Sequence, residues 1–340
     1  MKPLSYGIIS TASINDGGFI NHIKYIKDAD LLAVASRNPK TAKDYAAKRG
    51  IPRHYGSYEE LLSDADIDCV YISLPVSLHK KWSILSLKAG KNVLCEKPVA
   101  GSAREAEEIA EAVNSSGLIF AEAFHYRYHP LSSRIEEIVR NGEIGDVRSV
   151  YSQFGVRLFD KGKVQFRADC GGGALLDIGC YPVSFSRWIA DCDDAEILSA
   201  RADSDSDGVD RAAEAVMKFK NGVVAEINCS LADLLPPYAL IKGEKGSIFV
   251  FMPFSPAFRV GPAIIEPYIL VVRSGGNIRS LRVGKNTTYQ SQIEAFSKAV
   301  RTGVQPATDI REGIANMKLL DAIYEKAGVD RSACFDSGAS

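Results

Sequence analysis

Residues 92–98, Asn-Val-Leu-Cys-Glu-Lys-Pro, place a lysine where a buried strand is expected to stop. The apolar run at 93–95 is typical of a strand that is covered on both faces of a parallel sheet. Ligands of open α/β sheets lie beyond the carboxyl ends of the strands, and a proline fixes the backbone directly after Lys97. Lys97 could therefore act on a bound ligand, although a structural ion pair with Glu96 fits the same heptad.

A second segment with residues that could take part in a reaction is 171–188, which begins with three glycines and continues into a helical pattern. Asp177 and Tyr181 stand four residues apart, so on an α-helix they would share one face. A carboxylate can bind a substrate hydroxyl, and a phenol can transfer a proton. The alternative is a tyrosine at the edge of the core, with its hydroxyl satisfied by Asp177.

The elements that must position Lys97 alternate between strand and helix patterns over residues 1–124. Strands are predicted at 4–10, 31–36, 70–74, 92–95 and 118–124, and helices at 39–49, 78–89 and 103–116. The helix ends carry capping signals, such as Asn38 with Pro39 at one start and Gly50 at the corresponding end. Ser57 and Glu60 form a capping box before a further short helix. This alternation predicts an α/β Rossmann-type domain with a doubly wound parallel sheet.

From residue 125 onward the pattern changes to longer alternating segments, which predict an α+β domain with a large, mainly antiparallel, open-faced sheet. Strands are predicted at 147–158, 195–202, 213–219, 223–231, 247–251 and 269–272, and helices at 130–141, 174–190, 289–302 and 311–327. We therefore expect a dinucleotide-binding domain at 1–124 and a substrate-binding and dimerisation domain at 125–340, whose C-terminal helix is free to pack back on the first domain. The loops 232–242 and 252–268 are expected to line the substrate pocket.

The composition favours small-molecule partners over nucleic acid or a membrane. The chain has 340 residues, of which 46% are hydrophobic and 24% charged, and its net charge of -1 provides no basic excess. No apolar stretch approaches the roughly 20 residues of a membrane span, and the N-terminus lacks a signal-peptide pattern. Seven cysteines, with no Cys-x-x-Cys pair, suit reduced thiols in the cytoplasm. The five histidines show no metal-ligand spacing, so no metal site is expected.

The turn after the first predicted strand reads Ser-Thr-Ala-Ser-Ile-Asn over residues 10–15, where a dinucleotide-binding turn would carry Gly-x-Gly-x-x-Gly. Small residues replace the glycines, so the backbone can still approach a phosphate at a helix N-terminus. An ordinary strand-to-helix turn is the alternative.

Ser36 and Arg37 follow the second predicted strand, where an acidic residue would bind the adenosine ribose of NAD. A hydroxyl and a guanidinium suit the additional phosphate of NADP instead. We therefore expect NADP as the cofactor, with NAD possible, although a solvated loop arginine would give the same pattern.

The chain resembles the glucose–fructose oxidoreductase / inositol dehydrogenase / MocA-type oxidoreductases nearly end to end. The matching motifs lie at 7–12, 35–37, 71–75 with His79, 89–98, 122–127, 144–148 and 172–181. Glu-Lys-Pro at 96–98 is the most specific of them, and the glycine-poor turn departs from the family pattern. Tyrosine at position 181 looks like the dimeric dihydrodiol dehydrogenase, D-xylose dehydrogenase and sugar ketoreductase branch, which uses NADP.

The resemblance implies that Lys97 and Tyr181 are catalytic and that Asp177 orients the substrate. The predicted cofactor-binding residues are Ser10, Thr11, Ala12, Ile14, Ser36, Arg37, Leu74, Pro75, His79, Glu96 and Lys97. Weaker candidates for the substrate wall, chosen from their places around the cleft elements, are Tyr126, Arg127, Phe154 and Arg167. The large sheets of the family pair face to face, which implies a homodimer or a dimer of dimers.

The predicted function is reversible hydride transfer between NADP and the carbinol carbon of a sugar, a sugar derivative or a vicinal diol. Tyr181 would transfer the hydroxyl proton, and the Lys97 ammonium would lower the phenol pKa from its free value of about 10. Two alternatives remain open: a redox sensor that holds NADP without turnover, and a cofactor-assisted glycosidase of the same family.

Overall fold

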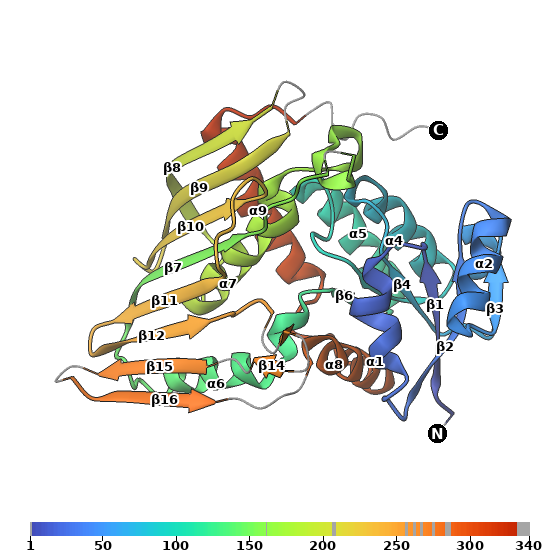
Figure 1. Cartoon of the computed structure of the whole chain (residues 1–340), viewed down its shortest axis with the longest axis horizontal. Helices are drawn as coiled ribbons and strands as arrows, with labels where there is room; N and C mark the ends of the chain where they lie inside the picture. The colour runs from blue at the N-terminus through green and yellow to red at the C-terminus, as the bar shows by residue number, and fades with distance from the viewer. Residues whose placement is uncertain are drawn as a thin grey trace. The chain divides into compact units, whose positions relative to one another are not determined.

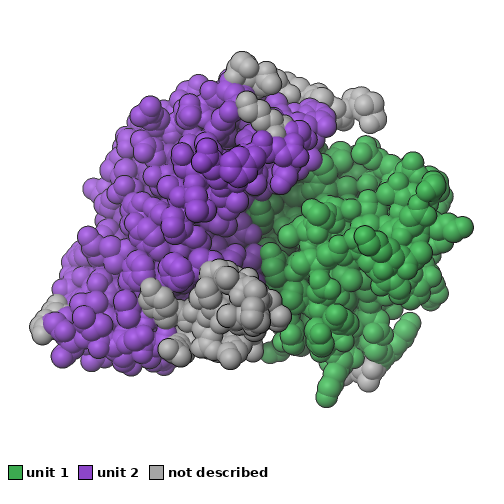
Figure 2. Space-filling view, viewed as in Figure 1, with its two compact units in different colours: residues 1–100, 104–124, 289–314 green, residues 101–103, 125–288, 315–340 purple. Residues whose placement is uncertain are grey.

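The computed structural model describes residues 2–160, 162–205, 209–255, 258–260, 263–265, 268–273, 276–282 and 287–331. The chain forms two compact units, which Figure 2 colours separately. Unit 1 is built from residues 1–100, 104–124 and 289–314, and unit 2 from residues 101–103, 125–288 and 315–340. Residues 289–314 therefore belong with the N-terminal part of the chain, although they follow most of unit 2 in sequence.

A six-stranded parallel sheet forms the centre of unit 1, in the order β3-β2-β1-β4-β5-β6 (Figure 1). The strands are β1 (Leu4–Ile9), β2 (Ala29–Ala35), β3 (Arg53–Tyr55), β4 (Cys69–Ile72), β5 (Asn92–Cys95) and β6 (Phe120–Glu122). The order reverses between β1 and β4, which is where a doubly wound sheet binds its ligand. The predicted doubly wound sheet is confirmed, and β3 adds a short edge strand that the sequence pattern did not indicate.

Helical layers cover both faces of this sheet. The helical segments are the π-helical turn η1 (Asp16–Ile20), α1 (Asn21–Ile23), α2 (Pro39–Arg49), α3 (Tyr58–Leu62), the 3-10 turn η2 (Val76–Leu78), α4 (His79–Lys88), α5 (Ala103–Ser116) and α8 (Thr288–Thr302). Tyr6 of β1 packs in a buried cluster with Phe19 of η1 and Phe296 of α8. The next residue, Gly7, faces α3 so closely that a Cβ would lie 2.9 Å from Leu61 Cδ2. Successive residues of β1 therefore serve opposite layers, as in a doubly covered strand.

The predicted capping signals of unit 1 take part in the hydrogen bonds expected of them. The Asn38 side chain accepts a hydrogen bond from the Thr41 N–H at 3.1 Å, and Gly50 ends α2 with a φ of 66°. The Ser57 hydroxyl accepts from the Glu60 N–H at 3.1 Å at the start of α3. These helix boundaries are local properties of the sequence, which is why they could be predicted.

Unit 2 contains an eight-stranded sheet in the order β16-β15-β12-β11-β7-β10-β9-β8 (Figure 1). Its strands are β7 (Val147–Gly155), β8 (Ala195–Ser204), β9 (Asp210–Phe219), β10 (Val224–Ser230), β11 (Tyr238–Gly243), β12 (Gly246–Phe251), β15 (Tyr268–Arg273) and β16 (Ile278–Arg282). Only β7 and β10 pair in parallel within this sheet, which confirms the predicted mainly antiparallel sheet. A separate pair of short strands is β13 (Phe258–Val260) with β14 (Ala263–Ile265).

One face of the large sheet packs against the helical segment that carries Asp177 and Tyr181. The helical segments of unit 2 are η3 (His125–Tyr128), α6 (Pro130–Arg140), η4 (Val164–Phe166), η5 (Ala168–Cys170), η6 (Leu175–Gly179), α7 (Cys180–Ala190) and the greater part of α9 (Ile310–Ala327). The Ser152 hydroxyl of β7 donates to the Pro182 carbonyl of α7 at 3.2 Å. On β10, Ile227 and Cys229 are fully buried. The alternation of buried and half-buried residues therefore follows the two faces of the sheet.

Two loop predictions differ from the structure. The predicted loop 232–242 ends in β11, a central strand that pairs with β7 and β12. Both faces of β11 are largely apolar, with Ala239 and Ile241 buried and Leu240 half-buried, so the sequence lacked the polar alternation that signals a strand. The predicted loop 252–268 lies partly outside the described residues, and its described part includes β13 and β14.

Among the described residues, no helix is both long enough and apolar enough to cross a membrane.

Candidate functional site

The carboxyl ends of three neighbouring strands in unit 1 finish at the same level. Ile9 of β1 pairs in register with Ile72 of β4, and Ile72 pairs with Cys95 of β5. The residues that come next along these strands are Ser10, Ser73, Glu96 and Lys97. Because parallel strands bind ligands beyond their carboxyl ends, this edge is the candidate cofactor site of unit 1.

Side chains hold the turn after β1 in place of glycine. Ser10 adopts a φ of 136°, which lies in the region that favours glycine. Its hydroxyl accepts a hydrogen bond from the Ala12 N–H at 2.9 Å and donates to the Ser73 carbonyl at 3.1 Å. The fully buried Asn15 donates from Nδ2 to the Ser10 carbonyl at 3.2 Å, while its Oδ1 accepts from the Ser73 hydroxyl at 2.5 Å. The glycine-poor turn is therefore rigidly supported, and Thr11 and Ala12 keep partly exposed backbone at its tip.

The acidic residue that follows this turn, Asp16, has its negative charge paired with Arg49. Arg49 of α2 donates to both carboxylate oxygens of Asp16, at 2.5 and 2.6 Å, and its guanidinium carbon lies 3.5 Å from the centre of the Tyr45 ring. The hydrogen bonds from Arg49 hold the pKa of the Asp16 carboxyl below its ordinary value. Asp16 is thus a paired charge, which reduces its repulsion of an anion bound at the turn. Ile14, the last predicted cofactor residue of the turn, is 38% exposed.

The end of β2 presents a serine and an exposed arginine. Ser36 is buried, and its hydroxyl accepts from the Asn38 N–H at 3.3 Å. Arg37 is exposed and lies close enough to Tyr58 for its charge to oppose the rise in the Tyr58 pKa that burial causes. The structure therefore leaves a cation available beside the strand edge, as the NADP prediction requires.

The turn that carries Lys97 is fixed through Glu96. Tyr71 donates from its hydroxyl to Glu96 Oε1 at 2.5 Å, and the Lys97 N–H donates to Glu96 Oε2 at 3.3 Å. Tyr71 is itself fully buried and stacks on Phe19, with 4.6 Å between ring centres. The backbone of Lys97 is therefore anchored to the core of unit 1 through two hydrogen bonds on one carboxylate.

His79 braces the same region from the side of β4. Its Nδ1 lies 2.8 Å from the Pro98 carbonyl oxygen and its Nε2 lies 2.8 Å from the Leu74 carbonyl oxygen, while the side chain is 1% exposed. Burial lowers the pKa of His79, and this effect exceeds the opposing one of the two carbonyls. The His79 ring thus lies between the turn after β4, where Pro75 lies, and the turn that contains Lys97, with one ring nitrogen against a carbonyl oxygen of each. A direct contact of His79, Leu74 or Pro75 with a cofactor stays a prediction.

These features fit a dinucleotide. The strand order, the supported turn at a helix start and the exposed cation after β2 are the three elements that such a ligand needs for its position, its pyrophosphate and its adenosine ribose. Unit 1 therefore belongs to the class of dinucleotide-binding Rossmann domains. Among the described residues, no group of three or more His, Cys, Asp or Glu side chains is placed to hold a metal ion.

Tyr181 of unit 2 lies in the first turn of α7 within an aromatic cluster. Its hydroxyl is 3.3 Å from His125 Nε2, a hydrogen bond in which either group can donate. The Tyr181 ring centre lies 5.7 Å from that of Phe154, 5.6 Å from that of Phe254 and 6.0 Å from that of Tyr126. Only 7% of Tyr181 is exposed, so its hydroxyl works in an environment that contains little water.

Asp177 lies in a π-helical turn, not in the regular α-helix predicted over 174–190. The turn η6 covers Leu175–Gly179, and α7 begins only at Cys180. Gly179 lies so close to β10 that a Cβ would sit 2.7 Å from Cys229 Sγ, which shows how tightly the wide turn rests on the sheet. Within this π-turn the Asp177 N–H still donates to the Gly173 carbonyl, four residues earlier, at 2.9 Å. One shared face for Asp177 and Tyr181 stays a prediction. Turns of the π type are frequent at functional sites.

The weaker candidates for the substrate wall fall into two groups. Phe154 faces Tyr181, and the Arg127 guanidinium lies over the Trp188 ring at 4.6 Å, so both belong to the aromatic surroundings of α7. Tyr126 is fully buried and its hydroxyl pairs with the Ser184 hydroxyl at 2.9 Å, which makes it a support for α7.

Arg167 lies in an exposed loop, where its guanidinium pairs with the Asp169 carboxylate at 2.5 Å. Its backbone carbonyl accepts from the Gly172 N–H at 2.9 Å, which connects this loop to the start of the helical segment that holds Asp177. A contact between the Arg167 side chain and a substrate stays a prediction.

The sequence analysis missed His125 and Phe254 as neighbours of Tyr181. His125 lies within a family motif, but it was considered only as a metal ligand, and 56 residues separate it from Tyr181. Phe254 stacks on Phe154 with 5.6 Å between ring centres, and no local pattern singles it out. The presence of His125 within a family motif was the one signal in the sequence that could have pointed to a polar neighbour of Tyr181.

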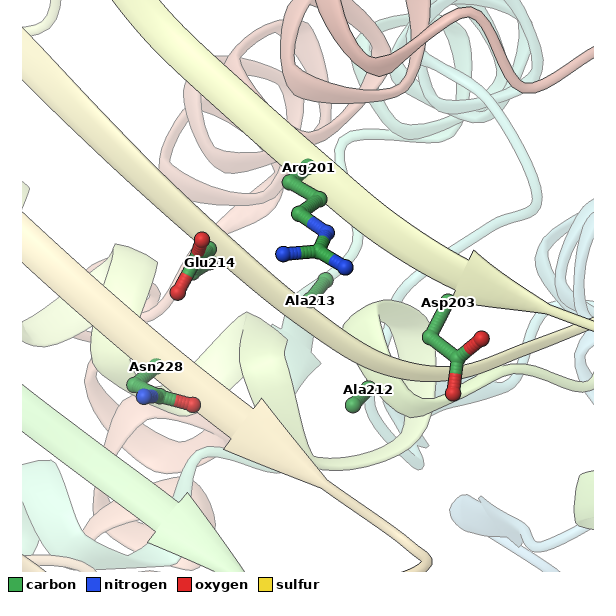
Figure 3. A pocket seen from close by; sticks show the side chains of 6 residues that line it. All are labelled: Arg201, Asp203, Ala212, Ala213, Glu214 and Asn228. Carbon is green, nitrogen blue, oxygen red and sulfur yellow. The ribbon is translucent and has the colours of Figure 1, made fainter.

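A hollow of about 270 Å³ lies on the sheet face that is turned away from α7 (Figure 3). Its lining residues are Arg201, Asp203, Ala212, Ala213, Glu214 and Asn228. Glu214 pairs in register with both Arg201 and Asn228, so these three side chains form one row across β8, β9 and β10. The hollow therefore contains none of the predicted site residues.

Two protein-family models match the chain. Residues 5–124 match the model of an oxidoreductase family with an NAD-binding Rossmann fold, and residues 133–249 match the GFO/IDH/MocA C-terminal domain. The chain belongs to the GFO/IDH/MocA oxidoreductase family. It is therefore an oxidoreductase with a nicotinamide-dinucleotide-binding domain, as the sequence motifs predicted.

Relatives with named activities cover 72% to 96% of this chain. D-xylose 1-dehydrogenase (NADP(+)) 2 of Haloferax volcanii is 34% identical over 325 residues, which cover 95% of this chain and 97% of that protein. The trans-1,2-dihydrobenzene-1,2-diol dehydrogenase of Mus musculus is 35% identical over 246 residues, or 72% of this chain and 73% of that protein. The crystal structure of KijD10, a 3-ketoreductase from Actinomadura kijaniata in complex with NADP and TDP-benzene, has a TM-score of 0.87 at 27% identity and covers 96% and 98% of the two chains. These matches confirm the predicted branch of the family.

Asn15→Ala should weaken NADP binding, because it removes both hydrogen bonds that join Ser10 to Ser73 through Asn15. A loss of about 1.4 kcal/mol at the turn corresponds to an affinity roughly tenfold lower, measured by calorimetric titration. The matched control is Asn92→Ala at the opposite edge of the sheet, where Asn92 donates to the Asp68 carbonyl at 3.1 Å and accepts from the Ile119 N–H at 3.0 Å. Equal losses of affinity in the two variants would show that the turn network has no special role.

Proposed function

We propose that the protein catalyses reversible hydride transfer between NADP and the carbinol or carbonyl carbon of a sugar, a sugar derivative or a vicinal diol. The main support for this proposal is the surroundings of the Tyr181 hydroxyl, which is hydrogen-bonded to His125 and enclosed by aromatic rings. A phenol in such surroundings is suited to exchange a proton with a substrate hydroxyl. The relatives named for D-xylose, a dihydrobenzenediol and a 3-ketoreductase activity support the choice of substrate.

Each residue has one role in the proposed reaction. When bound, the nicotinamide supplies the hydride acceptor for oxidation or the donor for reduction. Tyr181 takes the alcohol proton during oxidation and returns it during reduction, while His125 holds the phenol in place. Asp177 binds a neighbouring substrate hydroxyl. Lys97 provides the positive charge that favours the phenolate form of Tyr181.

The aromatic rings beside Tyr181 fit the faces of a sugar or a diol. Phe154 and Phe254 present apolar surface to the C–H groups of such a substrate and keep water away from the phenol. Arg127, stacked on Trp188, supplies a cation for a polar or anionic substituent. Which sugar or diol binds is decided by these groups together with the pocket loops.

We assign residues 1–124 to a dinucleotide-binding domain and residues 125–340 to a substrate-binding and dimerisation domain, with the segment 289–314 of the second range packed in unit 1. The two matched family models lie within these ranges and support the assignment. We place the protein in the cytoplasm, because an odd number of cysteines suits a reducing compartment.

Tyr181→Phe keeps the ring and its packing but removes the transferable proton. We expect turnover to fall by roughly 100- to 10,000-fold, with little change in NADP affinity. The assay follows the absorbance of reduced NADP with a panel of aldoses, inositols and diols. Tyr151→Phe is the matched control, because Tyr151 donates to Gln153 Oε1 at 2.8 Å on the sheet face away from α7.

Lys97→Met tests whether Lys97 and Tyr181 act together. Oxidation needs the deprotonated phenol, and losing a positive charge raises the phenol pKa, so the rise of the oxidation rate with pH should move to higher pH. The double variant should be little worse than the worse single variant, because residues that act as a unit are non-additive. Fully multiplicative losses would show that the two residues do not act as a unit. A Tyr181→Phe enzyme that keeps most of its activity would return Tyr181 to a packing role and leave Lys97 as the sole acid and base. A wild-type protein that binds NADP but turns over no member of the panel would favour the sensor alternative.

The cofactor is NADP in this proposal, because Ser36 and the exposed Arg37 replace the acid that binds the ribose of NAD. A charge-assisted hydrogen bond to phosphate contributes about 1.5–3 kcal/mol, so Arg37→Ala should weaken NADP by roughly 10- to 100-fold and leave NAD nearly unchanged. Lys48→Ala, which removes an exposed charge from the last turn of α2, is the control. Equal losses for NADP and NAD would rule out a contact between Arg37 and the additional phosphate.

We propose further that the large sheet joins two copies of the chain through its face away from α7. Tyr151, Tyr238 and Phe249 form a half-buried aromatic row there, with ring centres 5.4 and 5.6 Å apart. Leu240 pairs in register with Tyr151 and Phe249, so it lies between them on this face. Half-buried apolar surface of this kind is typical of interfaces between protein chains.

Leu240→Glu should convert the dimer into a monomer, since it places a charge inside the apolar row. The measurement is sedimentation velocity at several protein concentrations. Val304→Glu is the control, because Val304 is 65% exposed in unit 1 and the same charge is solvated there. A wild-type tetramer that becomes a dimer in the Leu240 variant would support a dimer of dimers, whereas an unchanged mass would place the interface elsewhere.

A further inference from the structure

The helical segment that holds Asp177 and Tyr181 starts on a buried carboxylate from β9. Asp210 Oδ2 accepts a hydrogen bond from the Leu175 N–H at 2.7 Å, and Leu175 is the first residue of the π-helical turn η6. The first N–H groups of a helix have no acceptor within the helix, so Asp210 satisfies one of them from a different element. The turn is therefore attached to the sheet at its first residue.

The backbone of unit 2 makes room for this carboxylate. Gly173 adopts a φ of 124°, and a Cβ on it would lie 2.1 Å from Asp210 Oδ1. No other residue type fits so close to the carboxylate without displacing it. Gly173 also accepts a hydrogen bond from the Asp177 N–H at 2.9 Å, so a single glycine contacts both Asp210 and the backbone of Asp177.

Helix α9 supports both ends of the π-turn. The Tyr324 hydroxyl donates to Asp210 Oδ1 at 2.8 Å, which fixes the carboxylate from the side opposite Leu175. About two helical turns earlier, Asn316 donates from Nδ2 to the Cys180 carbonyl at 3.4 Å, directly after η6 ends. Asp210, Asn316 and Tyr324 are 2%, 1% and 3% exposed. Water is therefore largely excluded from the groups that hold the turn.

The charge of Asp210 depends on these partners. Burial raises the pKa of its carboxyl, while the Leu175 N–H and the Tyr324 hydroxyl act in the opposite direction, as does the charge of Arg331. The Arg331 guanidinium lies 4.3 Å from the centre of the Tyr324 ring. A carboxylate at this depth has exchanged its hydration for a few fixed donors, which gives it a defined position.

We propose that Asp210 is a positioning residue for the reaction, which fixes the start of the π-turn and thereby the places of Asp177 and Tyr181. Tyr324 is the second member of this device, because it orients the carboxylate toward Leu175. The proposal rests on the proposed roles of Asp177 and Tyr181 in turnover. It assigns to α9, which contributes none of the predicted site residues, a part in the geometry of the site.

The experiment compares three variants, Asp210→Leu, Asp210→Asn and Tyr324→Phe. Asp210→Leu removes both acceptor oxygens, so the Leu175 N–H and the Tyr324 hydroxyl lose their partner. In Asp210→Asn the amide oxygen still accepts from the Leu175 N–H, and the NH₂ group donates to the Tyr324 hydroxyl, which is an acceptor as well as a donor. Asp210→Asn should therefore keep most of what Asp210→Leu loses, and Tyr324→Phe should have an intermediate effect.

Two measurements report on the variants. Amide hydrogen exchange in the peptide that covers residues 173–181 should be faster in Asp210→Leu and should stay close to wild type in Asp210→Asn. With NADP and the best substrate of the panel, the kcat of Asp210→Leu should fall by about 10- to 100-fold at an unchanged KM for NADP, because small displacements of reacting groups are costly. Lys91→Met is the control for general destabilisation, since Lys91 in unit 1 donates from Nζ to the Asp64 and Ile67 carbonyls at 2.7 and 2.8 Å. It should change neither measurement.

An Asp210→Asn enzyme that is as impaired as Asp210→Leu, or an Asp210→Leu enzyme with wild-type exchange and kcat, would overturn the proposal. A lower thermal stability with unchanged exchange and kcat would also overturn it, because that is the behaviour of a merely structural residue. If the wild type turns over no substrate, the proposed function fails, but the exchange measurement still decides whether Asp210 and Tyr324 hold the turn.

Discussion

The register between β1, β4 and β5 is the constraint on which unit 1 depends. Ile9, Ile72 and Cys95 lie side by side, and for this reason residues separated by more than eighty positions meet at one edge of the sheet. The support of the Ser10 turn requires that Ser73 follow β4 at that same level. A slip of one residue between β1 and β4 would turn Tyr6 and Gly7 toward the wrong helical layers, so the core and the turn enforce the same alignment.

In unit 2 the positions of the predicted site residues are fixed in a different way. The predicted site residues Asp177 and Tyr181 lie on a helical segment, whose position the strand register alone does not determine. The segment is attached to its surroundings through individual hydrogen bonds, from Ser152 to the Pro182 carbonyl, from Tyr126 to Ser184, and from the Leu175 N–H to Asp210. Parallel strands deliver loop residues to a common edge, whereas an antiparallel sheet provides a broad platform on which a helix has to be fixed point by point.

Local signals in the sequence were sufficient for much of the fold and for one part of the site. Asn38 and Gly50 mark a helix because their roles involve only neighbouring residues, and Glu96-Lys97-Pro98 marks a strand end for the same reason. The partnership of Ser73 with Asn15 spans 58 residues and that of His125 with Tyr181 spans 56, so no window of sequence contains either. The π-turn was missed because it leaves the helical periodicity almost intact, and because the close approach of Gly179 to Cys229 joins residues far apart in the sequence.

The turn after β1 also limits the routes by which this protein can evolve. In a turn made of glycines, each residue acts through its own backbone, so substitutions at different positions are nearly independent. Here Ser10, Asn15 and Ser73 satisfy one another, and replacing one leaves buried polar groups on the other two. The three positions should therefore covary among relatives. Conversion to a glycine-rich turn has to pass through intermediate sequences that have neither the full set of side-chain hydrogen bonds nor the full set of glycines. Such intermediates bind less well or are less stable, so a turn held by side chains should be retained once it has evolved.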